Sequence, residues 1–223
     1  MSLVFLCVFF FAVQTVVARS PVRSALFDDN GVMFLALPDV LTFLFSIHGL
    51  GLSLHFFWTP LTYIFLHGSA AHLIINMFGL LTFGSALERE FGKRTMLVVF
   101  FVSGIVGGLG WVALKGLESS QPCVGASAAA LGVIGAFAAL RPKAEFDLLI
   151  PFFSPWVRAW ELAVFLIAVN TLELFFGRGH IAYSAHLFGI VTGVLCGLAA
   201  RLIAERKRKI NLPKENEKER KKS

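Results

Sequence analysis

The hydrophobic and polar positions of this chain are arranged in long blocks rather than in the short alternations of a soluble fold. Six apolar blocks approach or reach the about 20 residues that a helix needs to cross a bilayer. These blocks are residues 3–18, 67–87, 95–114, 127–140, 156–176 and 184–204. The pattern predicts an all-α protein, a polytopic membrane helical bundle of six transmembrane helices.

The first apolar block has two interpretations. Residues 1–18 fit a first transmembrane span, but Val16-Val17-Ala18 also looks like the small-residue cleavage site of a signal peptide. Against a signal peptide, no charged residue precedes Gln14, so the usual basic n-region is missing. Both interpretations start with the N-terminus inside, so charge counting does not separate them.

The segment 19–58 contains a further apolar stretch, residues 31–58, that is long enough to suggest a seventh span. Pro38-Asp39 interrupts this stretch, and an aspartate at the middle of a membrane costs roughly 2.5–3.5 kcal/mol. Gly49 and Gly51 interrupt it again. We therefore predict that residues 19–58 form a loop lying in the outer leaflet.

Composition also places the chain in a membrane. Hydrophobic residues make up 57% of it and charged residues only 15%, with a mean hydropathy of +0.75. A soluble domain typically carries about 25% charged residues. The three cysteines, Cys7, Cys123 and Cys196, are far apart and match no metal spacing. We therefore expect no disulfide framework, no metal site and no cofactor.

The distribution of positive charge predicts how the helices are oriented. The net charge of +6 comes mostly from the tail, so it reports orientation rather than nucleic-acid binding. With the N-terminus inside, the inside segments hold 16 Lys and Arg residues and the outside segments hold 4. This asymmetry fits the positive-inside rule and predicts that both termini are cytoplasmic. The last stretch, residues 205–223, is a basic, low-complexity tail that we expect to be disordered.

The block 127–140 is too short to cross the membrane. Fourteen residues form roughly 21 Å of helix, whereas the hydrocarbon core is about 30 Å thick. Arg141 and Lys143 hold its inner end at the interface, so Ser127 should lie sunken at the outer end, below a hydrated depression. Gly125 suits a tight turn before Ser127. Alternatively, Ser127 is a packing serine beside small residues on the same helix (Ala128, Gly132 and Ala136).

The last apolar block carries a histidine on a face of small residues. Gly189, Gly193 and Gly197 recur every four residues, which lets another helix approach closely. His186 lies three residues before Gly189 and therefore on the same side of the helix. From there it can reach Ser127 and act as a general base. The alternative is a histidine that only forms a hydrogen bond between helices.

A third group of polar residues opens the second block. His72 and Asn76 are four residues apart and share a helix face, so both can donate hydrogen bonds to one oxyanion. The backbone N–H of Ser127 would be a third donor. His67, five residues before His72, is expected to be a supporting residue. Polar contacts between helices are the alternative, and metal binding by the two histidines is disfavoured because no carboxylate or thiolate accompanies them.

These motifs, in this order, resemble the rhomboid family of intramembrane serine proteases over roughly residues 58–200. The resemblance rests on Gly125-Ala-Ser127, on His186 with its glycines, and on the segment from Trp58 through Asn76 to Gly92. The chain departs from the family in three ways. Ala128 stands where glycine is usual, Leu131 where bacterial members often have tyrosine, and the loop lacks the Trp-Arg pair that is common there.

The resemblance implies a function and a role for each site residue. Ser127 is the implied nucleophile and His186 the general base and acid, in a dyad without a third acidic residue. His72 and Asn76 are the implied oxyanion donors. It also implies a catalytic membrane core over residues 59–204 and a retained first span, in a multi-pass protein of a bacterial cell membrane. Its partners would be other membrane proteins, cut near the extracytoplasmic face of the lipid bilayer, and not nucleic acid.

Two other functions fit parts of the sequence. A catalytically inactive rhomboid-like protein would bind membrane clients without cutting them, although the presence of Ser127 and His186 argues against this. A small transporter or channel would need acidic residues in its spans, and only Glu161 and Glu173 are candidates. No pair of inverted halves is visible in the sequence.

Overall fold

The computed structural model describes residues 2–18, 23–25, 34–147, 156–176 and 182–220, and this part of the chain is mostly helical. The helices are α1 (Ser2–Ala18), α2 (Leu37–Phe45), α3 (Gly49–Ser53), α4 (Thr59–Thr62), η1 (Tyr63–Phe65), α5 (Ala70–Gly79), η2 (Leu80–Gly84), α6 (Ser85–Phe91), α7 (Lys93–Lys115), α8 (Ser127–Leu140), α9 (Ala159–Phe176) and α10 (Tyr183–Arg220). The strands are β1 (Arg23–Ala25), β2 (Phe34–Ala36), β3 (Glu145–Asp147) and β4 (Trp156–Arg158), which pair as two small antiparallel hairpins.

Among the residues that the structure describes, four helices are long and apolar enough to cross a membrane. They are Ala70–Phe91 (α5, η2 and α6 in succession), Lys93–Lys115, Ala159–Phe176 and Tyr183–Arg206. Two further apolar helices, Ser2–Val17 and Ser127–Leu140, are shorter. The predicted all-α membrane fold is therefore supported, but helix length bears out four spans rather than six. Of the two short helices, Ser127–Leu140 is the one that the sequence predicted to be too short to cross the membrane.

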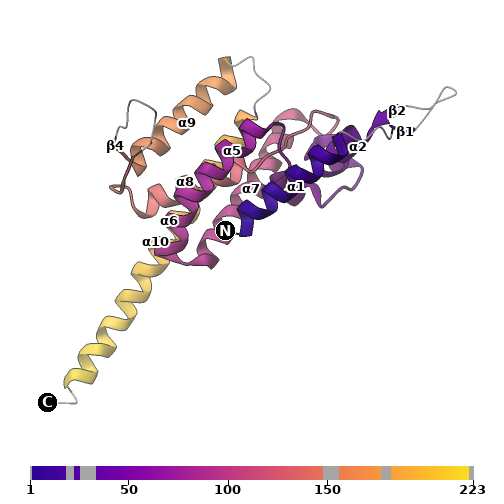
Figure 1. Ribbon diagram of the computed structural model, residues 1–223. Helices are drawn as coiled ribbons and strands as arrows, with labels where there is room; N and C mark the ends of the chain where they lie inside the picture. Colours follow the sequence, from indigo (N-terminus) through magenta and orange to yellow (C-terminus); the bar gives the residue numbers. More distant parts are fainter. Residues whose placement is uncertain (1, 19–22, 26–33, 148–155, 177–181, 221–223) are drawn as a thin grey trace.

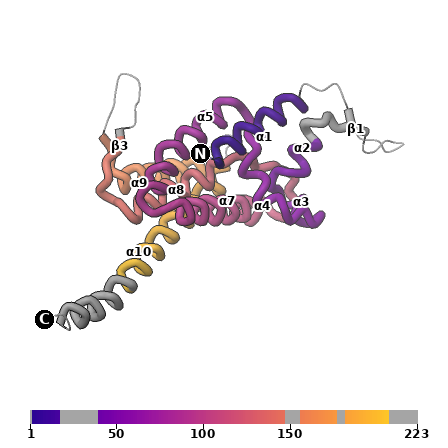
Figure 2. Tube along the Cα trace, turned by 60° about the horizontal axis from the view of Figure 1, so that its bottom comes forward, coloured from indigo at the N-terminus to yellow at the C-terminus, as the bar shows by residue number. Residues whose placement is uncertain are grey.

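The short helix α8 lies at the centre of the bundle. Ten of its 14 residues are buried, and it packs against both α7 and α10. Figure 2 shows α8 between α7 on one side and α5 with α1 on the other. A helix that other helices surround on most sides does not have to match the thickness of the bilayer, because its ends can meet protein instead of lipid.

The small-residue face predicted on the last block packs against the small-residue face of α8. Gly189 lies against Ala128, Gly193 against Gly132 and Gly197 against Ala136. These three contacts step along both helices in the same direction, so α8 and α10 are parallel and begin at the same end of the bundle. A Cβ atom on Gly197 would lie 2.6 Å from the carbonyl oxygen of Ala136, so the two backbones are in direct contact.

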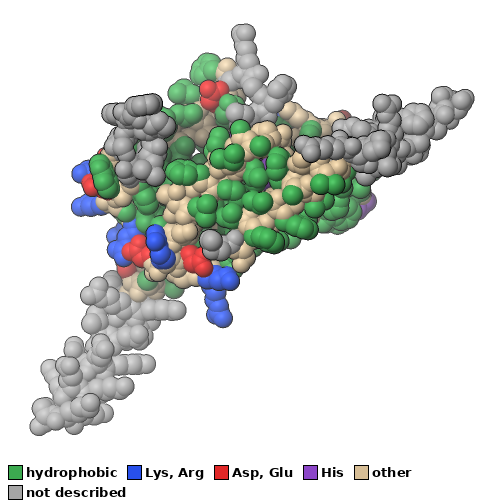
Figure 3. All heavy atoms as spheres, viewed as in Figure 1, with side chains coloured by type: hydrophobic (Ala, Val, Ile, Leu, Met, Phe, Trp, Pro, Cys, Tyr) green, Lys and Arg blue, Asp and Glu red, His purple; other side chains and the backbone are tan. Residues whose placement is uncertain are grey.

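The surface separates apolar and charged regions. In Figure 3, hydrophobic side chains cover the flank of the bundle, while Lys, Arg, Asp and Glu side chains gather mainly toward the end from which α10 emerges. At that end Arg141, just after α8, pairs with Glu90 of α6. An apolar flank with most of the charges toward one end is the surface expected of a bundle that lies in a bilayer.

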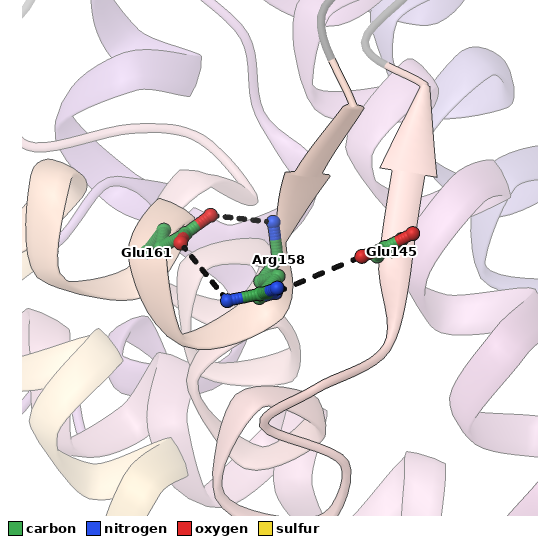
Figure 4. Close-up of polar contacts among 3 residues, drawn as sticks. All are labelled: Glu145, Arg158 and Glu161. Carbon is green, nitrogen blue, oxygen red and sulfur yellow. Dashed lines mark hydrogen bonds and ion pairs between the residues drawn. The ribbon is translucent and has the colours of Figure 1, made fainter.

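A second cluster of charges joins the β3–β4 hairpin to the start of α9. Arg158 lies 3.6 Å from Glu145 and 3.9 Å from Glu161, and its backbone N–H donates to Glu161 at 2.9 Å (Figure 4). All three side chains are at least 40% exposed, so these pairs contribute little to stability. They do account for Glu161, which the sequence left as a candidate for ion binding.

The described part of segment 19–58 is more regular than the loop expected from the sequence. It contains β1, β2 and the two short helices α2 and α3. Pro38 is the second residue of α2, where the missing N–H costs nothing, so Pro38-Asp39 begins a helix instead of interrupting one. Ile47 pairs with Cys123 through two backbone hydrogen bonds of 3.1 and 2.9 Å, which attach this segment to the loop before α8.

The structure describes the C-terminal segment as far as Arg220, and the disorder expected for residues 205–223 stays a prediction. Helix α10 continues to Arg220 and extends well beyond the bundle (Figure 1). Lysine, arginine and glutamate are good helix formers even where nothing packs against them. An Arg201–Glu205 pair of 3.1 Å, one turn apart, adds support at the point where the helix leaves the bundle.

Candidate functional site

Ser127 is the first residue of α8, directly after a sharp turn of the backbone. The turn depends on Gly125, whose φ of +124° is in a region that favours glycine. The N–H of Gly125 donates to the carbonyl oxygen of Tyr63 at 2.9 Å, which fixes the turn against the segment before α5. The first N–H bonded within α8 is that of Ala130, to Ala126, so the N–H of Ser127 has no acceptor inside its own helix.

His186 faces Ser127 from the first turn of α10. Its Nε2 atom lies 2.8 Å from Oγ of Ser127, within hydrogen-bond distance. The contact follows from the packing of the two helices, since Gly189 against Ala128 brings the starts of α10 and α8 together. The structure thus places the two side chains that the sequence proposed as nucleophile and base next to each other.

Asn170 of α9 is a third member of this group, and our reading of the sequence missed it. Its Oδ1 atom lies 2.8 Å from Nδ1 of His186, on the side of the ring away from Ser127. The side chain is only 6% exposed. The signal was a lone asparagine inside an apolar block, which is rare because a buried amide needs partners.

The start of α5 supplies two more polar side chains. A Cβ atom built on Gly125 would lie 2.8 Å from Nε2 of His72 and 3.6 Å from Nδ2 of Asn76, so both face the backbone just before Ser127. Asn76 is 4% exposed, and its Nδ2 has no hydrogen-bond partner within the described residues. Unsatisfied buried donors are uncommon and often mark a place where another molecule supplies the acceptor.

His67 lies beside His72 rather than beside Ser127. The two imidazole rings are 5.3 Å apart, centre to centre. The backbone N–H of His67 donates to the side-chain oxygen of Gln14 in α1 at 3.0 Å, and its Nδ1 lies 3.2 Å from the carbonyl oxygen of Phe65. His67 thus contacts α1 and the segment before α5, and its supporting role stays a prediction. Among the described residues, no group of three or more His, Cys, Asp or Glu side chains could hold a metal ion.

A cavity of about 330 Å³ adjoins this group from the side of α1 and α2. Its polar lining includes Gln14, Thr42 and His67, and it reaches Val124, next to Gly125. A cavity of this size with several polar groups is large enough for water. Of the polar residues described above, His67 lines this cavity directly, and the cavity ends beside the turn that leads to Ser127.

Three of these polar side chains lie in the first turns of three different helices. His72 is near the start of α5, Ser127 starts α8 and His186 is near the start of α10. Each is held by a local feature that the sequence contains: Ser69 caps α5 by accepting the N–H of His72 at 3.1 Å, glycine forms the turn before α8, and a glycine face seats α10. Such a group can activate a hydroxyl and stabilise an oxyanion beside it.

Comparison with known proteins finds relatives that are similar in sequence, of which we describe three. Rhomboid-like protease 3 of Toxoplasma gondii is 32% identical over 143 residues, 64% of this chain and 49% of that protein. The putative rhomboid protease YdcA of Bacillus subtilis (strain 168) is 31% identical over 151 residues, 66% of this chain and 69% of that protein. Rhomboid protein 1, mitochondrial, of Saccharomyces cerevisiae is 32% identical over 151 residues, 66% of this chain and 43% of that protein.

The matched stretch is less than half the length of two of these relatives. A family model, the Rhomboid domain, matches residues 55–202, which runs from the end of the α3 segment through the membrane part of α10. This range contains Ser127, His186, Asn170, His72, Asn76 and His67, together with three of the helices of spanning length and most of the fourth, Tyr183–Arg206. The chain is therefore an integral membrane protein that belongs to the rhomboid family.

Proposed function

We propose that this protein is an intramembrane serine endopeptidase that cleaves transmembrane proteins with Ser127 and His186. The observation that carries the proposal is the 2.8 Å contact between Nε2 of His186 and Oγ of Ser127. A serine hydroxyl is a weak nucleophile unless a base takes its proton, and a histidine within hydrogen-bond distance is the usual base. Relatives that are named as proteases support the same reaction class.

In the first step, Oγ of Ser127 attacks the carbonyl carbon of the scissile peptide bond while its proton moves to Nε2 of His186. The carbonyl oxygen becomes an oxyanion, which the N–H of Ser127 and the side chains of His72 and Asn76 stabilise by hydrogen bonds. His186 then gives its proton to the leaving amine, and the carbon–nitrogen bond breaks. Removing one oxyanion donor typically costs about 2.7–4 kcal/mol of transition-state stabilisation.

In the second step, water attacks the acyl group on Ser127, with His186 again taking a proton. The oxyanion forms a second time, and its collapse releases the new carboxyl end and returns the proton to Ser127. Water has to reach a site inside a membrane protein for this step. The cavity beside His67 and Val124 supplies a polar space next to the turn that carries Ser127.

The substrates are membrane proteins, cut near the extracytoplasmic surface. Ser127 begins its helix at the end of the bundle opposite Arg141 and Glu90, which belong to the predicted inside segments. With both termini cytoplasmic, this puts Ser127 on the extracytoplasmic side, where a helix of 14 residues falls short of the surface.

The test is labelling of the full-length protein in lipid vesicles by a fluorophosphonate probe, which reacts with activated serines. We expect the probe to label the wild type and Ser103→Ala but not Ser127→Ala. Ser103 is a matched control because it is a fully buried serine of α7 that packs against α8 at Gly132. Equal labelling of the wild type and Ser127→Ala would contradict the proposal. It would also be contradicted if neither protein is labelled and the wild type cleaves no transmembrane substrate.

A further inference from the structure

From the geometry around His186 we infer that Asn170 is a positioning residue: it holds the imidazole in the tautomer and orientation in which Nε2 can accept the proton of Ser127. The inference rests on the proposed function, since it concerns the base of that reaction. Asn170 touches neither Ser127 nor the place where a substrate would bind, and it acts through His186.

Three helices contribute one side chain each to a continuous chain of hydrogen bonds. Oδ1 of Asn170 in α9 lies 2.8 Å from Nδ1 of His186 in α10, and Nε2 of His186 lies 2.8 Å from Oγ of Ser127 in α8. Both ring nitrogens of the histidine are thereby occupied. A ring held at two opposite atoms cannot rotate away from the serine without breaking one of the bonds.

The hydrogen bond made by the amide nitrogen of Asn170 determines which ring nitrogen of His186 carries the proton. Nδ2 of Asn170 donates to the carbonyl oxygen of Leu166 at 2.8 Å. A carbonyl oxygen only accepts, so the amide nitrogen has to face Leu166 and the amide oxygen has to face His186. That oxygen also only accepts, so Nδ1 of His186 carries the proton. Nε2 is then left with a lone pair directed at Ser127.

Thr171, the next residue of α9, is a polar side chain whose hydrogen bond stays within its own helix. The hydroxyl of Thr171 donates to the carbonyl oxygen of Ile167 at 2.7 Å, one turn earlier in α9. Asn170 forms the equivalent bond to Leu166 but has an acceptor atom left over, and that atom contacts another helix. Without His186, the buried Oδ1 would lose this partner.

An amide is well suited to this position in a membrane. It accepts a hydrogen bond from Nδ1 as a carboxylate does, but it is neutral, and a charged side chain inside a bilayer is costly. It orients the ring without compensating the positive charge that the ring acquires during the reaction. We therefore expect Asn170, which only positions the base, to contribute about 10- to 100-fold to kcat, at or below the smallest effect that general acid–base catalysis itself supplies.

The experiment compares Asn170→Leu, Asn170→Asp and Thr171→Val with the wild type, each as the full chain in lipid vesicles. Asn170→Leu should lower kcat for a transmembrane substrate by about 10- to 100-fold with KM changed by less than about twofold. Asn170→Asp, which keeps an acceptor oxygen, should recover most of the loss. Thr171→Val, which removes a local hydrogen bond from the adjacent position, should leave both constants unchanged.

A spectroscopic measurement separates this inference from the proposed function. In protein with ¹⁵N-labelled histidine, His186 should be protonated at Nδ1 in the wild type and a mixture of tautomers in Asn170→Leu, whether or not the protein cleaves anything. If the tautomer changes as expected but no Ser127-dependent cleavage is detected, only the proposed function is contradicted. The inference itself is overturned if Asn170→Leu keeps the wild-type tautomer or kcat. It is equally overturned if kcat, KM and melting temperature fall together and Asn170→Asp restores none of them.

Discussion

Gly193 of α10 lies so close to Gly132 of α8 that the backbones of the two helices touch, with no room for a side chain on Gly193. The neighbouring contacts, Gly189 with Ala128 and Gly197 with Ala136, repeat this relationship one turn before and one turn after. The separation of Ser127 and His186 at the starts of these helices is therefore set by backbone contact rather than by the choice of side-chain rotamers.

The first prediction follows from this contact. Gly193→Ala should force the two helices apart at a cost of about 1–3 kcal/mol, because the new methyl group would meet the backbone of Gly132. Both the melting temperature and kcat should fall, although neither Ser127 nor His186 has been changed. Gly79→Ala is the matched control, since a Cβ there has no atom within 4 Å. Unchanged activity in Gly193→Ala would show that the helices tolerate a wider spacing.

The second prediction concerns the turn before Ser127. Gly125→Ala should reduce turnover by at least about tenfold, because it combines a strained φ of +124°, which costs of order 1–3 kcal/mol, with a clash against the ring of His72. The measurement is kcat on a transmembrane substrate together with thermal unfolding. Gly68→Ala, where a Cβ has no atom within 4 Å, should behave like the wild type. A fully active Gly125→Ala protein would mean that the observed turn is not needed for the reaction.

A third prediction separates oxyanion donors from polar contacts between helices. Asn76→Ala should lower kcat by about 10²–10³-fold, with a smaller change in KM, because the bond to the oxyanion forms mainly in the transition state. The melting temperature should stay close to that of the wild type, since Nδ2 of Asn76 has no partner to lose within the described residues. The opposite pattern, intact turnover with a lower melting temperature, would identify Asn76 as a structural residue. His72→Ala should change kcat in the same direction.

The fourth prediction concerns the substrate. A helix hides its peptide carbonyls in internal hydrogen bonds, so Ser127 can attack only a segment that has become extended. Cleavage should therefore require Gly, Pro or other helix-weakening residues near the extracytoplasmic end of the substrate span. Replacing those residues by Leu should reduce the rate, and mass spectrometry should map the cut to that end. Equivalent replacements at the cytoplasmic end are the control and should have no effect, whereas a cut mapped there would contradict the proposed orientation.

The fifth prediction concerns Cys123, in the loop between α7 and α8. Burial raises the pKa of the Cys123 thiol to about 12, so the reactive thiolate is scarce until the pH approaches that value. Iodoacetamide at pH 8 should therefore modify Cys123 only slowly in the folded protein and rapidly after unfolding in dodecyl sulfate. Rapid modification of the folded protein would show that the Ile47–Cys123 pairing opens and that segment 37–53 does not stay attached to the loop before α8.

The sequence predicted those parts of the structure that depend on local pattern. The block 127–140 coincides with α8, because the turn at Gly125 and the polar residues from Arg141 mark its ends. The glycine row on α10 predicted a close helix contact, which was found. The starts of α2 and α3 were missed because Pro38 and the glycines were interpreted as interruptions, although proline and glycine are equally common where short helices begin and end.

Contacts between elements that are distant in the sequence were harder to predict. No periodicity in residues 156–176 indicates that Asn170 faces His186, since that depends on how α9 is rotated against α10. The division of the second block into α5, a π-helical turn (η2) and α6 also has no clear signal in the sequence. Lipid-facing and protein-facing positions are both apolar in a membrane, so hydropathy locates a span better than it predicts its rotation.

The meeting of three helix starts at one place has an electrostatic consequence. The N-terminus of a helix carries a partial positive charge of roughly half an elementary charge, and α5, α8 and α10 all begin around Ser127. An oxyanion formed there would lie at the positive ends of three macrodipoles, in surroundings where water screens them little. The field that favours the negative charge then comes from the peptide backbone itself, which requires no buried cation and is unaffected by pH.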